Sequence, residues 1–180
     1  MKDLSTATKI LGMQIVRDRP TKTLFLTQVG YVKKVLNRFI MEYSKPVLTP
    51  LSAHFKLFKL QEPTTDADIE YIKKIPYSNA VGSVMYAMVC SRPNITYGVG
   101  VVSRFMGNLD KEHLIGVKWI LRYLKGSSNH GILFGNVDGA TYEVAGFVDS
   151  DFEGDLDKKR SITGFVLTMC GGDISWKAFL

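Results

Sequence analysis

The spacing of apolar residues changes once along this chain, and that change limits the folds open to it. Between residues 29 and 125, apolar side chains recur at helical intervals, most clearly in the run from Leu114 to Leu124. After Gly126 they alternate with a period of two, which is typical of half-buried strands. We therefore predict an α+β chain with a helical middle and a three- or four-stranded antiparallel sheet at its C-terminal end.

Local signals divide the chain further. Residues 8–26 have the alternation of a β-hairpin, with turn residues at 17–22. Thr27 is a good N-cap for the helical pattern that follows, and Pro46, Pro50 and Pro63 make residues 44–63 a loop or extended linker. Further helices are expected over 65–74, 77–90, 94–106 and 111–125, and strands over 131–134, 142–148, 161–169 and 173–176.

Charge is distributed unevenly. The net charge is +8 over residues 1–60, +2 over 61–125 and −4 over 126–180. With 46% apolar and 22% charged residues, the 180-residue chain is neither disordered nor a coiled coil. The basic front suggests a polyanionic partner, with ordinary surface charge as the alternative.

Basic residues follow one side of two predicted helices. Lys33, Lys34 and Arg38 lie opposite the apolar face of the helix after Thr27. The helix over 111–125 carries four cations at offsets of 7, 11 and 14, which are Lys111, Lys118, Arg122 and Lys125. Such a line suits the phosphates of a nucleic acid, and a solvated charged face is the competing interpretation.

An acidic cluster begins where the strand over 142–148 is expected to end; its members are Asp149, Asp151, Glu153, Asp155 and Asp157. Carboxylates at a strand end can hold Mg²⁺, although an acidic surface loop explains them equally. Cys90 and Cys170 are too few for a disulfide scaffold and suit a reducing, intracellular compartment, cytoplasmic or nuclear. The sequence contains neither zinc-ligand spacing nor a phosphate-binding glycine loop.

A series of short blocks covers the whole chain. Residues 45–51 read K-P-V-L-T-P-L, residues 77–86 read Y-S-N-A-V-G-S-V-M-Y, and residues 117–126 read V-K-W-I-L-R-Y-L-K-G. The other blocks are Met1–Leu4, Ile10–Met13, Ser91–Ile95, Phe147–Asp155 and Ser161–Phe165. In this order, the blocks resemble the C-terminal part of a Ty1/copia-type retrotransposon Pol polyprotein.

The resemblance implies three parts. Residues 1–26 would end the reverse transcriptase palm with a primer-grip-like hairpin, residues 27–130 would form a thumb- and connection-like helical region, and residues 131–180 would open a truncated ribonuclease H-like domain. The implied nucleic-acid contacts are Leu11, Gly12, Met13, Lys33, Lys34, Arg38, Lys118, Arg122 and Lys125. The implied partners are an RNA–DNA or RNA duplex, held through its phosphates, and the rest of the Pol polyprotein. No membrane contact is expected.

The resemblance also bears on catalysis. The family's polymerase aspartates would precede Met1, and this chain contains no Asp-Asp pair. Asp149 matches the first of about four ribonuclease H carboxylates that hold two Mg²⁺ ions, with Asp151 as a weak neighbour, and the other ligands would follow Leu180. We therefore expect a reverse transcriptase/ribonuclease H fragment with no activity and no functional Mg²⁺ by itself. A residual duplex-binding module and a pseudogene product with no selected function are the alternatives.

A missing part of the ribonuclease H-like domain has a structural consequence. In the family, a helix packs on the C-terminal sheet, and its sequence would follow Leu180. We therefore expect that sheet to show an uncovered apolar face.

Overall fold

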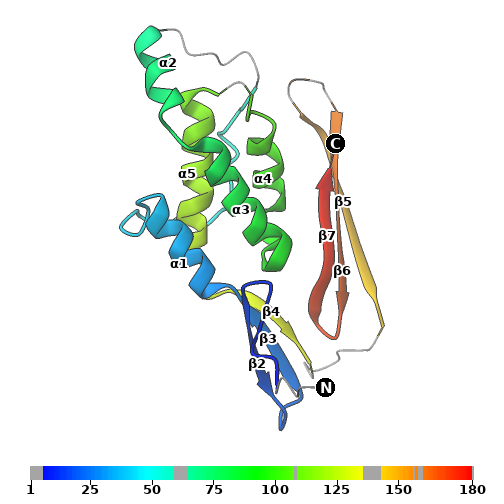
Figure 1. Cartoon of the computed structure of the whole chain (residues 1–180). Coiled ribbons are helices and arrows are strands. Elements are labelled where there is room, and N and C mark those ends of the chain that lie inside the picture. The colour runs from blue at the N-terminus through cyan, green and yellow to red at the C-terminus, as the bar shows by residue number, and fades with distance from the viewer. Residues whose placement is uncertain are drawn as a thin grey trace, which may run out of the picture.

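The computed structural model describes residues 6–58, 65–107, 109–135, 143–155, 157 and 160–179. Over these residues the fold is mixed α/β, with two antiparallel sheets and five α-helices, which confirms the predicted mixture (Figure 1). The helices form one body, with a four-stranded sheet at one end and a three-stranded sheet along one side (Figure 1).

The first sheet has the strand order β1-β2-β3-β4, and all of its neighbours are antiparallel. Its strands are β1 (Lys9–Ile10), β2 (Met13–Asp18), β3 (Thr23–Thr27) and β4 (Gly131–Phe134). The predicted hairpin over 8–26 is confirmed as β2 and β3, paired from Asp18 and Thr23 outward. A second, tighter turn at Leu11 and Gly12 joins β1 to β2.

Strand β4 corrects one expectation. The sequence predicted a strand over 131–134 correctly, but we had grouped it with the C-terminal sheet. It pairs instead with β3, with Leu24 opposite Phe134 and Thr27 opposite Gly131. An alternating pattern predicts a strand but not the neighbouring strand that it pairs with, so this pairing could not be predicted from the local sequence.

The helical body consists of α1 (Val29–Arg38), α2 (Asp66–Lys73), α3 (Tyr77–Ser91), α4 (Thr96–Ser103) and α5 (Lys111–Gly126), with the short 3-10 turn η1 (Pro93–Ile95) before α4. The single helix expected over 94–106 is therefore η1 followed by a shorter α4. Its core is built from apolar faces of α1, α3, α4 and α5, including Val32, Val84, Val99 and Leu121. Because these residues recur at helical spacing, the predicted periodicity and the buried face agree.

Helix α5 begins at a capping box. The Asp110 carboxylate accepts a hydrogen bond from the Glu112 backbone N–H at 3.3 Å, and the Asp110 backbone N–H donates to His113 Nδ1 at 3.0 Å. The His113 ring is fully buried and stacks on Phe105, with ring centroids 4.0 Å apart. Burial lowers the pKa of His113, and the nearby Asp110 opposes this only in part.

The second sheet is a meander of β5 (Ala145–Asp155), β6 (Arg160–Met169) and β7 (Gly172–Phe179). It is joined to the helical body by a hydrogen bond from Trp176 Nε1 to the Met88 carbonyl oxygen at 3.0 Å. Phe147 and Val148 point to opposite faces of β5, yet they are 64% and 77% exposed. The edge strand β5 therefore leaves apolar side chains uncovered, whereas residues 162–168 of the central strand β6 are half-buried, so the expectation of an uncovered apolar face is met only in part.

Strand β5 also changes the setting of the acidic cluster. We expected a strand to end before Asp149, but β5 continues to Asp155, and Asp149 pairs with Gly164 inside the ladder. The turn between β6 and β7 lies at Cys170 and Gly171, one residue earlier than the sequence suggested. No helix in the described part of the chain is long and apolar enough to cross a bilayer.

His113 predicts how stability depends on pH. Because its pKa is lower in the folded state, the unfolded chain binds the proton more tightly, and stability is lost as the pH falls below about 6.5. We expect a lower melting temperature near pH 5 than near pH 7.5. In His113→Gln this difference should shrink, as measured by circular dichroism. An unchanged pH dependence in the variant would contradict the assignment.

Candidate nucleic-acid interface

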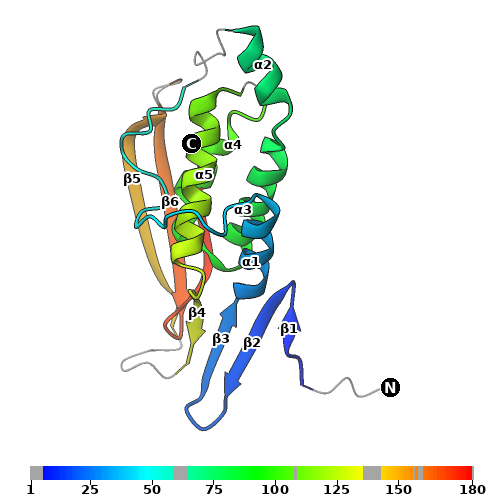
Figure 2. The same cartoon turned by 90° about the vertical axis from the view of Figure 1, so that its left-hand side faces the viewer.

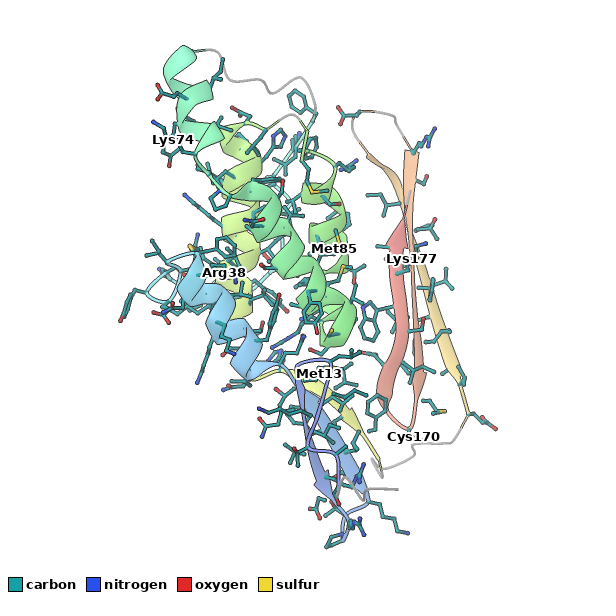
Figure 3. All side chains as sticks on the ribbon, in the orientation of Figure 1. Met13, Arg38, Lys74, Met85, Cys170 and Lys177 are labelled. Carbon is teal, nitrogen blue, oxygen red and sulfur yellow. The ribbon has the colours of Figure 1, made fainter. Side chains whose placement is uncertain are left out.

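The turn at Leu11 and Gly12 protrudes from the first sheet. Both residues have positive φ, 46° and 72°, as the two-residue hairpin turn requires. Leu11 is 69% exposed, so its side chain is open to a ligand. Met13, the third residue expected here, is only 7% exposed and lies between the sheet and the helices (Figure 3). Of the predicted hairpin contacts, the structure therefore exposes Leu11 and Gly12 and buries Met13.

Tyr86 holds this turn against α3. Its hydroxyl donates a hydrogen bond of 2.6 Å to the Leu11 carbonyl oxygen, across 75 positions of sequence. A Cβ atom at Gly12 would lie 3.6 Å from the same hydroxyl, so the turn is in close contact with Tyr86. A hydrogen bond with Cys90 and, to a smaller extent, burial raise the pKa of Tyr86 above its ordinary value.

Helix α1 meets the same end of α3. The ring centroids of Tyr31 and Tyr86 are 5.0 Å apart, and the Tyr31 hydroxyl donates a hydrogen bond of 3.0 Å to the Ser83 carbonyl oxygen. Lys34 follows Tyr31 by one helical turn and is exposed, as is Lys33. Tyr86 of α3 therefore contacts both the Leu11–Gly12 turn and Tyr31 of α1.

The cations predicted on α5 have different surroundings. The Arg122 Nε donates to the Lys45 carbonyl oxygen and the Lys125 Nζ to the Ser44 carbonyl oxygen, each at 2.6 Å. Trp119 Nε1 donates to the Thr49 carbonyl oxygen at 2.9 Å, and the Arg122 guanidinium lies 5.0 Å from the Trp119 ring centre. We call residues 44–49 the strap, because these three side chains of α5 hold its backbone.

Lys118 lies apart from the strap. It is exposed and lines a pocket of about 280 Å³ together with Arg38 from the end of α1. The other walls are apolar and come from the segment after α1, from residues 75–80 and from α5. The predicted line of cations on α5 thus divides, with Arg122 and Lys125 on the strap and Lys118 facing α1.

The acidic cluster does not form a metal site in the part of the chain that is described. Asp149 is exposed, and no group of three or more His, Cys, Asp or Glu side chains gathers there or elsewhere among the described residues. The side chains of Asp151, Glu153 and Asp155 lie outside the described part. Of the predicted cluster, the described side chains are those of Asp149 and Asp157, and no third His, Cys, Asp or Glu joins them among the described residues.

Sequence reasoning missed the aromatic residues that organise this surface. Tyr31, Tyr86 and Trp119 each sit in an apolar helical pattern, which predicts burial but not the carbonyl group that a polar tip will reach. A tyrosine or tryptophan on an apolar helix face could have indicated a hydrogen bond to another segment, because a partly buried Oη or Nε1 needs an acceptor.

We expect Arg122 and Lys118 to differ in their contribution to stability, because Arg122 binds the strap and Lys118 lies apart from it. We expect Arg122→Ala to lower the free energy of unfolding by about 1 kcal/mol, because the Lys45 carbonyl and the Trp119 ring lose their partner. Lys118→Ala is the matched control on the same helix and should change it by less than about 0.5 kcal/mol. Urea unfolding measures both. Equal losses in the two variants would show that the Arg122 contacts add nothing.

The sequence is similar to those of several known proteins. The chain is 51% identical over 180 residues to the retrovirus-related Pol polyprotein from transposon TNT 1-94 of Nicotiana tabacum, covering all of this chain and 13% of that protein. It is 35% identical over 183 residues to the Pol polyprotein from transposon RE1 of Arabidopsis thaliana, covering 99% of this chain and 11% of that protein. An uncharacterized mitochondrial protein of Arabidopsis thaliana is 33% identical over 178 residues, which are 99% of this chain and 69% of that protein.

The chain therefore spans a small part of the polyproteins that it matches. No family model and no solved structure matches it. The two polyproteins align along nearly its whole length, and the order of sequence blocks described above is that of the same family. The chain belongs to the family of the retrovirus-related Pol polyproteins of copia-type transposons.

Proposed function

We propose that this fragment comes from the junction of reverse transcriptase and ribonuclease H and that it holds an RNA–DNA duplex through its phosphates. The observation that carries the proposal is the contact that Tyr86 of α3 makes with both the exposed Leu11–Gly12 turn and Tyr31 of α1. Helix α1 also carries the exposed Lys33 and Lys34 on its outer side.

Lysine and an exposed turn suit a duplex for different reasons. Lys33 and Lys34 supply positive charge, which releases counterions from a nucleic-acid backbone and gives affinity without reading sequence. The Leu11–Gly12 turn carries no charge and is available for contact with sugars at the edge of a duplex. We propose Lys33 and Lys34 as the principal phosphate contacts. Arg122 and Lys125 would have to release the strap carbonyls before they bound a phosphate.

The proposed division of the chain follows the strand pairing. The palm-like end is residues 1–26, and the thumb- and connection-like region begins at residue 27. Because β4 pairs with β3, we propose to place β4 with this first body and to begin the ribonuclease H-like part at β5 rather than at residue 131. The antiparallel meander β5-β6-β7, with Asp149 inside β5, supports that assignment.

Catalysis by this fragment alone is not part of the proposal. Two-metal phosphoryl chemistry requires carboxylates from several elements around both ions. The described carboxylates do not gather in this way, and Asp149 is exposed. We propose binding of the duplex without turnover.

Charge reversal on α1 tests the proposal. We expect Lys33→Glu combined with Lys34→Glu to weaken binding of a fluorescent RNA–DNA hybrid to the full chain, because two phosphate contacts are replaced by repulsion. The loss should be similar for unrelated hybrid sequences. The slope of log affinity against log salt should fall by about 0.9 for each phosphate contact removed. Fluorescence anisotropy at several salt concentrations measures both quantities.

The control is Arg17→Glu combined with Arg19→Glu, which makes the same change in net charge at the far end of the hairpin. Equal effects of the two double variants would mean that only net charge matters, and would contradict the proposed interface. The same hybrid, incubated with Mg²⁺ and the wild-type chain, should stay intact on a denaturing gel. Cleavage that disappears in Asp149→Asn would contradict the absence of turnover.

A further inference from the structure

Helices α1, α2 and α5 enclose a groove on the side of the helical body away from β5–β7, the side that faces the viewer in Figure 2. One end is the pocket of about 280 Å³ that contains Phe39, Ile40 and Ile75. A second hollow of about 420 Å³ contains Tyr71 and Ile115. Leu114 and Lys118 line both, so the two hollows form one elongated groove along the first half of α5. We call it the α5 groove.

The floor of the α5 groove is apolar, and much of it is accessible. Ile40 is 88% exposed, and Tyr71 and Ile115 are about half exposed. An exposed apolar surface of this kind, continuous over three helices, costs free energy in water and marks a binding surface. Its walls offer few polar groups, so the occupant must present apolar side chains rather than hydrogen-bonding edges.

The rim of the groove is basic. Arg38 lies at the end near α1, Lys118 at the middle and Lys111 at the far end. The described residues that line the groove include no Asp or Glu. Charge complementarity therefore calls for an acidic occupant.

We propose that the α5 groove binds an acidic amphipathic helix from another protein chain. Such a helix places apolar side chains at positions i, i+3, i+4 and i+7 on one stripe, which matches an elongated groove between helices. Its flanking carboxylates then face Arg38 and Lys118 across the rim. A nucleic acid also satisfies the charge, but buried base edges would lose their hydrogen bonds on this floor, whereas apolar side chains carry no such cost.

This inference is independent of the proposed duplex contact, which rests on Lys33, Lys34 and the Leu11–Gly12 turn. The sequence analysis assigned Arg38 and Lys118 to the duplex, whereas the groove assigns them to an acidic helix. Variants of these two residues should weaken peptide binding if the groove assignment is right, and hybrid binding if the duplex assignment is right.

The test uses the full chain and two synthetic helical peptides of about five turns. Both peptides carry leucines at the same stripe positions, and the remaining positions are mainly glutamate in one and lysine in the other. We expect the wild-type chain to bind the glutamate peptide and not the lysine peptide in fluorescence anisotropy. Arg38→Glu combined with Lys118→Glu should weaken binding of the glutamate peptide about tenfold and create binding of the lysine peptide.

The melting temperature of the double variant, measured by circular dichroism, shows that it is folded, so that a gain of lysine-peptide binding reports the reversed rim. Arg17→Glu combined with Arg19→Glu again controls for net charge and should leave both peptides unaffected. The inference is overturned if the wild-type chain ignores the glutamate peptide, or if the Arg38/Lys118 variant binds it unchanged. Loss of RNA–DNA hybrid binding in that variant, with no peptide binding in the wild type, would assign the groove to nucleic acid.

Discussion

The fold depends on helix α5, which is bound on two sides. Its apolar stripe, including Leu121 and Leu124, is buried against α1, α3 and α4. On its outer side Trp119, Arg122 and Lys125 hold the strap over residues 44–49 by hydrogen bonds to backbone carbonyls. A Cβ atom at Gly126 would approach the Pro46 side chain to 3.1 Å, so the strap also closes over the end of the helix. These contacts give an irregular segment a fixed path without a strand or helix of its own.

The pairing of β3 with β4 completes the same body. Residues 24–27 and 131–134 are about a hundred positions apart, and the whole helical region lies between them. Since β3 leads directly into α1 and β4 follows α5, the sheet joins the first and last helices of the body. The hairpin is thereby tied to the helices, and Tyr86 adds a second link at the Leu11–Gly12 turn. The meander β5–β7 is attached more sparingly, through Trp176 and a hydrogen bond between the Gly135 N–H and the Cys170 carbonyl.

The sequence predicted the helices and strands better than the tertiary contacts between them. The stripe from Leu114 to Leu124 predicted α5 because periodicity reports directly which face is buried. The same periodicity placed Lys118, Arg122 and Lys125 on one side, but it carried no information about the strap that two of them bind. Long side chains reach acceptors set by tertiary structure, which a helical pattern does not encode. Met13 is buried for the related reason that a residue beside a turn can belong to the core.

We propose that the nucleic acid binds where the Leu11–Gly12 turn and α1 contact Tyr86 of α3, and away from β5–β7. Hydrogen–deuterium exchange of the full chain, with and without an RNA–DNA hybrid, tests that placement most directly, because it locates the contact without altering a residue. The account predicts slower exchange in the peptides that contain Leu11–Met13 and the exposed residues of α1, with β5–β7 unchanged. Slower exchange confined to β5–β7, or none anywhere in a complex shown to form, would contradict it.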